Sequence, residues 1–169
     1  TDEFRETVSF LDGFGRVYRT QKEGPQGKIV ETRTVRDGLG RVVAESRPFF
    51  ASESPVFTRI DYDPLGRVVV REAPGGRVTT MTHQRGVVSV VDPNGNRRDR
   101  VRNAHGDVVE VREYPNGAGG SPITTSYAYD HAGRLEKVSD PNDNVTAIAY
   151  DALGRRRLID DPDTGATTF

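Results

Sequence analysis

The sequence predicts an all-β fold built from tandem antiparallel β-hairpins, and three observations support this fold class. A short phrase with the pattern Asp-x-x-Gly-Arg recurs along the chain, usually followed by an aliphatic residue. A second turn signal, mostly of the Asp-Pro type, falls between several copies of this phrase. The segments that separate the turns are short and often β-branched, as in β-strands. No stretch shows an apolar period of about 3.6 residues over roughly ten positions, so we expect no helix.

The phrase occurs in five good copies and two degenerate ones. The good copies supply the predicted turn residues Asp12, Gly15 and Arg16; Asp37, Gly40 and Arg41; Asp63, Gly66 and Arg67; Asp130, Gly133 and Arg134; and Asp151, Gly154 and Arg155. The degenerate copies, 83–86 and 103–107, lack the first aspartate and the arginine. The seven copies start near positions 12, 37, 63, 83, 103, 130 and 151. Such a spacing, about 20 to 27 residues, predicts a repeat array in which each unit is stabilised by its neighbours.

The phrase has a mechanical interpretation as a turn. An aspartate at the first position can accept a hydrogen bond from the backbone two residues on, and glycine at the fourth position supplies the left-handed conformation of a three-residue hairpin loop. The chain should therefore reverse at each copy, with the aspartate and the arginine close together on adjacent strands. Such an ion pair is worth only about 0.2–1 kcal/mol, so we interpret it as setting the strand register.

The residues that flank each turn should form a cross-strand pair. The residue before the aspartate is apolar or aromatic in several copies, and we expect it to lie opposite the residue after the arginine. The pairs expected are Leu11 with Val17, Tyr62 with Val68, Tyr129 with Leu135, and Tyr150 with Arg156. Each hairpin would then carry one apolar rung beside one charged rung, on opposite faces.

The second turn signal divides each repeat into strand, turn, strand and turn. Proline takes the position that it presets in the turns 92–96, 140–144 and 161–165, and more loosely in 73–76. Between the turns, strands are expected at 67–71, 86–91, 107–112 and 144–150.

Composition limits the possible classes of protein. Only 34% of the 169 residues are hydrophobic and 29% are charged, which fits a thin sheet with two partly wet faces. The net charge of −1 gives no reason to expect nucleic acid or an anionic membrane as a partner, and the absence of cysteine excludes disulfide scaffolds and thiolate zinc sites. No apolar run is long enough to span a bilayer. Because the chain starts at Thr1 and stops at Phe169 soon after a turn, we expect residues 1–169 to be one repeat region cut from a longer array, with any targeting signal outside it.

Tyr62–Arg67 and Tyr129–Arg134, with Asp-Pro-Asn turns nearby, resemble the YD repeats of the Rhs family. Phe10–Arg16 through Arg47–Phe50 more specifically resembles the B component of the bacterial insecticidal Tc toxins. The resemblance implies a curved strip of hairpins that forms the wall of a larger β-shell. It also implies a secreted or cell-surface protein whose partners are further repeats of the parent chain and an enclosed toxic or bioactive C-terminal segment. The two degenerate copies depart from the family pattern, the family's self-cleavage region has no counterpart here, and seven repeats are too few to close a shell.

Catalytic and ligand-binding interpretations are weaker. Almost every aspartate occupies a turn-starting position, and His83, His105 and His131 lie in separate turns, so we expect no enzyme, no cofactor and no metal site. The turns 92–96 and 140–144 place oxygen side chains at positions one, three and five, as in an EF-hand. The sixth position is Arg97 or Val145 instead of glycine, which favours plain turns.

Three functional classes remain at this point. The first is a structural wall that encapsulates a toxic segment. The second is a surface module that recognises carbohydrate or protein, and the third is an enzyme with a closed pocket. Unpaired edges at 4–10 and 147–169 would also allow copies of the chain to associate.

Overall fold

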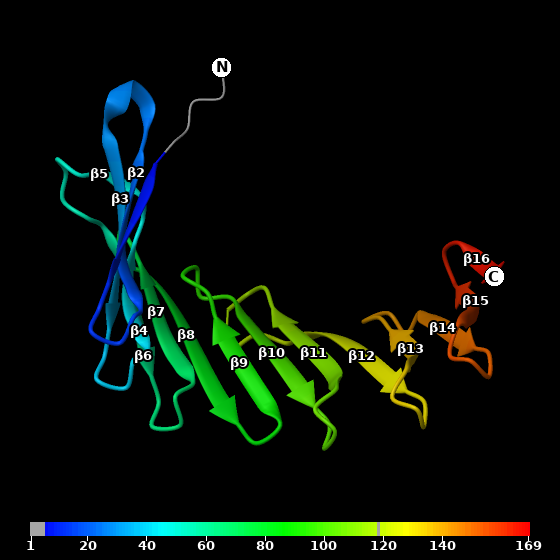
Figure 1. The fold of residues 1–169 in the computed structure, drawn as a ribbon. Coiled ribbons are helices and arrows are strands. Elements are labelled where there is room, and N and C mark those ends of the chain that lie inside the picture. The colour runs from blue at the N-terminus through cyan, green and yellow to red at the C-terminus, as the bar shows by residue number, and fades with distance from the viewer. Residues whose placement is uncertain (1–5, 118) are drawn as a thin grey trace. The chain divides into compact units, whose positions relative to one another are not determined.

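The structure is a computed structural model that describes residues 6–117 and 119–169. Its strands pair antiparallel throughout, and no α-helix occurs in the described ranges, which confirms the predicted all-β hairpin fold (Figure 1). The strands are β1 (Thr7–Leu11), β2 (Val17–Glu23), β3 (Ile29–Arg36), β4 (Val42–Ser46), β5 (Phe49–Phe50), β6 (Phe57–Tyr62), β7 (Val68–Ala73), β8 (Arg77–Gln84), β9 (Val87–Val91), β10 (Arg97–Arg102), β11 (Val108–Tyr114), β12 (Ile123–Tyr129), β13 (Leu135–Ser139), β14 (Val145–Tyr150), β15 (Arg156–Asp161) and β16 (Gly165–Thr168).

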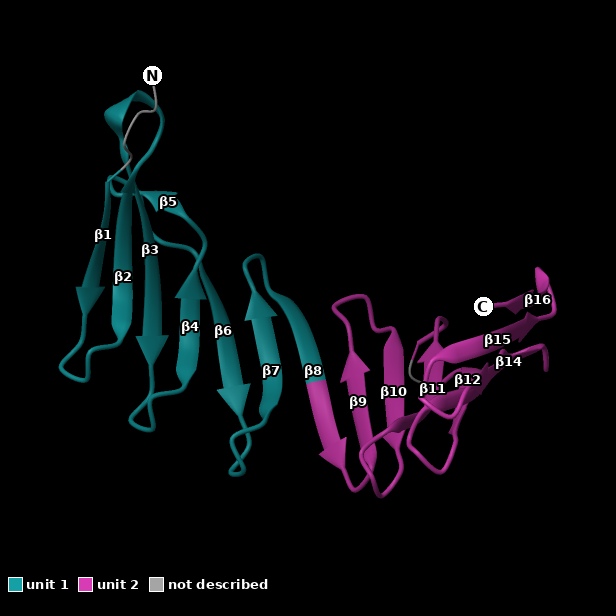
Figure 2. Cartoon of the chain, turned by 45° about the vertical axis from the view of Figure 1, so that its right-hand side comes forward, with its two compact units in different colours: residues 1–80 teal, residues 81–169 magenta. Residues whose placement is uncertain are grey.

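The chain divides into two compact units, residues 1–80 and 81–169, and β8 runs across the division (Figure 2). In the first unit the strand order is β1-β2-β3-β4-β6-β7-β8. The two-residue strand β5 pairs with β3, which also pairs with β2 and β4. A short 3-10 turn, η1 (Pro25–Gly27), lies between β2 and β3, and Gln26 adopts a left-handed φ of 60° there.

The second unit is a meander in which each strand from β9 to β16 pairs with the next one along the chain. Its connections are the turns that the sequence repeats, apart from the longer loop between β11 and β12. Local hairpin pairing of this kind needs no long crossover, so the repeat can be extended one strand at a time.

The hydrophobic core is minimal. Among the described residues, Phe49 is the only hydrophobic side chain that is buried. The other two buried side chains are the carboxylates of Glu31 and Asp99. Burying a carboxylate is unfavourable unless it is paired and hydrogen-bonded. Each unit is therefore stabilised mainly by the hydrogen bonds between its strands and by polar contacts between long side chains.

Both buried carboxylates have such partners. Glu31 accepts a hydrogen bond of 2.9 Å from the Gln21 amide and pairs with Arg33, and these contacts lower its pKa. Burial acts to raise the pKa of Asp99. The two bonds of 2.7 Å from the Arg97 guanidinium, together with hydrogen bonds from Ser89 and Tyr114, outweigh burial, so the pKa is lowered. An arginine side chain thus pairs with each of the two buried carboxylates.

Candidate functional site

The five Asp-x-x-Gly-Arg turns share one geometry, which the turn at Asp63 illustrates. The Asp63 amide donates to the Arg67 carbonyl and the Gly66 amide donates to the Asp63 carbonyl, both at 2.9 Å. Asp63 Oδ1 accepts the amides of Leu65 and Arg67, each at 2.9 Å, and Oδ2 accepts Arg67 Nε at 2.7 Å. One carboxylate therefore fixes both the backbone of the loop and the arginine beyond it.

The same three side-chain bonds occur in the other four turns, which start at Asp12, Asp37, Asp130 and Asp151. The glycines at the fourth position, Gly15, Gly40, Gly66, Gly133 and Gly154, all have positive φ. The ion pairs that close these turns are Arg16 with Asp12, Arg41 with Asp37, Arg67 with Asp63, Arg134 with Asp130, and Arg155 with Asp151.

The strand register shifts by one residue next to each of these turns. Tyr62 lies opposite Val68, whereas Asp61 lies opposite Val70, so one residue is left over as a bulge. The corresponding pairs Leu11 with Val17, Tyr129 with Leu135, and Tyr150 with Arg156 have the same shift. A left-handed glycine beside such a bulge is the usual ending of a three-residue hairpin loop.

The turn carboxylates are electrostatically stabilised. The pKa of Asp63 is held below its ordinary value first by the backbone amide of Arg67; burial opposes this, and the guanidinium of Arg67 and the amide of Leu65 add to the lowering. The pKa of Asp151 is lowered in the same way by the amide and guanidinium of Arg155. These groups are therefore charged acceptors at neutral pH, and their oxygens are occupied by bonds within the turn.

The tyrosine before the aspartate connects one repeat with the repeat before it. Tyr62 Oη donates a bond of 2.7 Å to the Val42 carbonyl, and the Arg41 guanidinium lies 4.7 Å from the centre of the Tyr62 ring. Tyr150 repeats the arrangement, with a bond of 2.8 Å to the Leu135 carbonyl and with Arg134 at 4.7 Å. We call this contact of a tyrosine with the arginine and following carbonyl of the preceding turn the tyrosine–arginine clasp.

A third tyrosine makes part of the clasp. Tyr129 Oη donates to the Val108 carbonyl at 2.9 Å, where the preceding turn carries Asp107 instead of arginine. The sequence analysis assigned these tyrosines only to a cross-strand pair within their own hairpin and missed the clasp. The sequence signal for the clasp is the tyrosine hydroxyl at this position. If the residue only formed an apolar cross-strand pair, phenylalanine would serve equally well.

The arginine of one turn also lies against the glycine of the next. A Cβ atom at position 40 would collide with Nη1 of Arg16, and one at position 154 would lie 3.5 Å from Nη1 of Arg134. That same Nη1 is 3.5 Å from the carbonyl oxygen of Asp151, to which it donates. At both positions the left-handed backbone is what requires glycine; a Cβ at position 40 would only displace the flexible end of Arg16, and one at position 154 would make an ordinary contact.

Turns without the arginine keep the geometry by substituting another donor. In 92–96 the Asn96 amide donates to Asp92 Oδ2 at 3.1 Å, and in 140–144 the Asn144 amide donates to Asp140 Oδ2 at 2.8 Å. The degenerate copy 103–107 reverses the roles, because the amide of Asn103 donates to Asp107 at 3.1 Å. The Asp-Pro-Asn turns, which the sequence analysis treated as a separate signal, are therefore variants of the same turn.

The third turn position carries a large apolar side chain in four of the five good copies. Phe14, Leu39, Leu65 and Leu153 are 85, 81, 77 and 78% exposed, respectively. Asn94 and Asn142 occupy the same position in the variant turns, so the loop geometry does not require an apolar residue there. The loop geometry therefore does not explain why these exposed tips are apolar.

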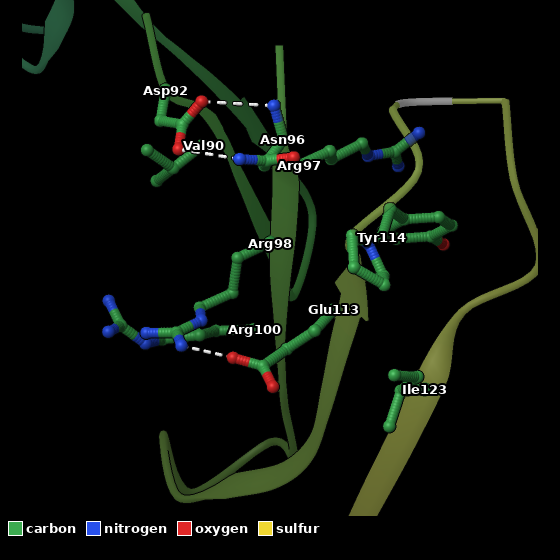
Figure 3. A pocket seen from close by; sticks show the side chains of 10 residues that line it. Val90, Asp92, Asn96, Arg97, Arg98, Arg100, Glu113, Tyr114 and Ile123 are labelled. Atoms are coloured by element: carbon green, nitrogen blue, oxygen red, sulfur yellow. Dashed lines mark hydrogen bonds and ion pairs between the residues drawn. The ribbon is translucent and has the colours of Figure 1, made fainter. Parts of the chain in front are cut away.

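The second unit also contains a pocket of about 590 Å³ on the strands β9 to β12 (Figure 3). Arg98 and Arg100 extend to the same side of β10, with Glu113 beside them, whereas Arg97 extends toward Tyr114 on the other side. Arg98 forms an ion pair with Glu113. The sequence analysis did not identify this pocket, because its lining residues come together only through the pairing of neighbouring strands.

The histidines are not brought together by the fold. His83 lies within strand β8, not in a turn as the sequence predicts, whereas His105 and His131 lie in turns of other hairpins. Within residues 6–117 and 119–169, no group of three or more His, Cys, Asp or Glu side chains could hold a metal ion. A search of the described residues found no helix that is long and apolar enough to cross a membrane.

Known proteins share this hairpin architecture. Residues 129–168 match the model of the RHS Repeat family, and no curated protein matches the chain. The crystal structure of TcdB2-TccC3-Cdc42 matches 97% of this chain with a TM-score of 0.79 at 18% sequence identity. That of TcdB2-TccC3 matches 97% with a TM-score of 0.79 at 19% identity. The structure of TcdB2-TccC3 without its hypervariable C-terminal region matches 97% with a TM-score of 0.72 at 18% identity.

These matches concern a small part of much longer chains. The present chain corresponds to 11% of the matched chain in the first two structures and to 12% in the third. At this sequence identity the similarity establishes the fold, and it confirms the resemblance to the repeats of Tc toxins that the turn phrases indicate. Residues 129–168 thus match the RHS Repeat model, and the chain as a whole has the β-hairpin repeat fold found in the Tc toxin complex TcdB2-TccC3.

Proposed function

We propose that this chain is a structural wall segment, one stretch of a longer repeat array that encloses a toxic or bioactive C-terminal segment for delivery. The observation that carries the proposal is the tyrosine–arginine clasp. It joins the hairpin of β3 and β4, whose turn carries Arg41, to the hairpin of β6 and β7, which contains Tyr62. The same contact recurs between Arg134 and Tyr150. A contact repeated between successive hairpins stabilises a continuous strip of sheet.

The composition of the interior supports the same function. With Phe49 as the only buried hydrophobic side chain among the described residues, the sheet has little apolar surface to bury between layers. A single layer whose two faces are both partly wet is suited to separate two aqueous spaces. The fold shared with TcdB2-TccC3 over 97% of the chain agrees with such a wall.

The partners follow from this proposal. They are further repeats of the parent chain, paired at the terminal strands, and a C-terminal segment held inside the shell. The site of action would be outside the producing cell, in a secreted protein or one on a bacterial surface. The turn residues act as structural determinants of the strip, with no part in catalysis.

The test uses the complete protein that contains this chain. Limited proteolysis should cut its C-terminal segment slowly in the native protein and rapidly after denaturation, and electron microscopy should show a closed hollow particle. A double variant that removes two clasp hydroxyls, Tyr62→Phe with Tyr150→Phe, should accelerate the cleavage. Equal cleavage rates in native and denatured protein would contradict encapsulation.

A second function is favoured by the turn tips. Phe14, Leu39 and Leu65 are exposed without a structural need, as expected for a surface that recognises carbohydrate or another protein. Glycan-array binding that disappears in a Phe14→Ser, Leu39→Ser and Leu65→Ser variant would favour this function over the wall. No binding, together with an intact closed particle, would favour the wall.

A further inference from the structure

Four strands of the second unit present a row of side chains that combines apolar groups with opposite charges. Val90 on β9, Arg98 on β10, Glu113 on β11 and Ile123 on β12 lie opposite one another in register. Residues directly opposite each other in antiparallel strands project from the same face. The row therefore places an Arg–Glu pair between two apolar side chains, along the wall of the pocket in Figure 3.

The neighbouring row on the same face contains a second arginine. Arg100 lies two residues after Arg98 on β10, opposite Val88 on β9 and Val111 on β11. Because side chains two residues apart on a strand share a face, the two guanidinium groups border the same space. Arg100 forms no hydrogen bond or ion pair with any residue in the described ranges, in contrast to Arg98.

The other charges around the pocket are already paired. Arg97 donates two bonds of 2.7 Å to Asp99 on the opposite face. The carboxylate of Asp92 accepts the backbone amides of Asn94 and Asn96 and the side-chain amide of Asn96. The pocket thus keeps one positive charge without a counter-charge, flanked by valine and isoleucine side chains.

We propose that this pocket binds a small organic anion, a carboxylate or phosphate group carried on an apolar or aromatic body. Arg100 holds the anionic group, and the body lies against Val90, which lies on the neighbouring strand β9 diagonally across from Arg100. The volume of about 590 Å³ falls in the range of small-molecule pockets, roughly 300–1,000 Å³. This site is independent of the proposed wall function, because it needs only the strand register of the second unit.

Glu113 sets the strength of binding at this site. Its carboxylate occupies the Arg98 guanidinium and repels an incoming anion. Removing this charge frees Arg98 to join Arg100 in holding the anionic group. The pocket therefore predicts opposite effects for two substitutions on neighbouring strands, weaker binding for Arg100→Gln and tighter binding for Glu113→Gln.

The experiment titrates the chain with phenyl phosphate at constant ionic strength and follows binding by NMR chemical shifts. Binding should be saturable, with shifts concentrated on β9 to β12. Arg100→Gln should weaken it by about tenfold, the effect of losing one charge-assisted hydrogen bond. Glu113→Gln should tighten it. Benzoate should bind the same site, inorganic phosphate should bind more weakly for lack of an apolar body, and neutral benzyl alcohol should not bind.

The matched controls are Arg59→Gln and Glu72→Gln. These two residues form an ion pair at 4.0 Å beside a separate pocket of about 290 Å³ in the first unit, so the substitutions reproduce the same changes in net charge. They should leave binding unchanged. Equal effects of the control and test substitutions, a non-saturable titration, or full binding by Arg100→Gln would each overturn the proposal. Circular dichroism of each variant verifies that the sheet is intact.

Discussion

The hydroxyl of Tyr62 donates a hydrogen bond of 2.7 Å to the main-chain carbonyl of Val42, and this bond joins two successive hairpins. The two residues are 20 positions apart in the sequence and belong to successive repeats of the turn phrase. The same relationship holds between Tyr150 and Leu135. The tyrosine of the repeat phrase is therefore an inter-repeat contact, whereas the aspartate and arginine first shape the turn.

Tyr62→Phe should lower the free energy of unfolding by about 0.5–1.5 kcal/mol, the net value of one hydrogen bond, because the Val42 carbonyl loses its donor. Urea denaturation followed by circular dichroism measures the effect. Tyr127→Phe is the control, since no hydrogen bond of the Tyr127 hydroxyl occurs within the described residues. Equal midpoints for both variants would show that the inter-repeat bond contributes nothing.

Gly40→Ala should destabilise the chain by about 1–3 kcal/mol, because the residue has a φ of +83°, a conformation that alanine adopts poorly. Gly38→Ala, two residues away in the same turn, meets open space and should change stability by no more than about 0.5 kcal/mol. Thermal denaturation of the two variants provides the comparison. Similar losses for both would contradict the requirement for glycine at the fourth position.

Arg41→Ala should destabilise more than Arg67→Ala. Both arginines pair with the aspartate of their own turn, but Arg41 also stacks on the Tyr62 ring. The exposed ion pair at Arg67 is worth under about 1 kcal/mol, and the stacking adds about 0.5–1 kcal/mol at Arg41. A larger loss at Arg67, measured by chemical denaturation, would mean that the clasp is not the stronger contact.

Stability should fall on acidification. The pKa values of Asp12, Asp63, Asp130 and Asp151 are lowered in the folded chain, first by the backbone amide of the arginine four residues on. Folding therefore favours the charged carboxylates. Their stabilisation is complete above the unfolded pKa of about 4 and is lost as the pH falls through the lower folded values. Melting temperatures measured from pH 7 to pH 2 should decline once the pH falls below about 4, and Asp63→Asn should reduce the decline. A constant melting temperature would contradict the turn assignment.

The isolated chain should associate with itself at high concentration. Strands β1 and β16 each pair on one side only within the described structure, so their outer edges are open to strand addition. Light scattering should show a mass that rises with concentration. A strict monomer at high concentration would contradict this prediction and would favour a self-contained binding module.

The fold class was predictable because its determinants are local. An aspartate such as Asp63 and a glycine such as Gly66 act within a loop of a few residues, so a single repeated phrase marks each reversal. The cross-strand pair of Tyr62 with Val68 follows from the length of that loop. The β-branched residues between the turns then favour β-strands over helices in those segments.

The contacts between repeats were not predictable from the same phrases. The bond from Tyr62 to Val42 depends on how one hairpin is placed on the next, and the pocket around Arg100 depends on the register of neighbouring strands. The burial of Asp99 was also missed, because hydropathy assigns a carboxylate to the surface. Its partners are Arg97 and the hydroxyls of Ser89 and Tyr114, polar contacts that an apolar pattern does not indicate.

The scarcity of buried apolar side chains has a thermodynamic consequence. Unfolding raises the heat capacity mainly through the exposure of apolar surface, by about 12–15 cal/mol/K per residue in an ordinary domain. A chain in which Phe49 is the only buried hydrophobic residue described, and in which the other apolar side chains are at most partly buried, exposes less apolar surface on unfolding. Its heat-capacity increment per residue should therefore be small and its stability curve flat, so that the strip tolerates cold as well as it tolerates moderate warming.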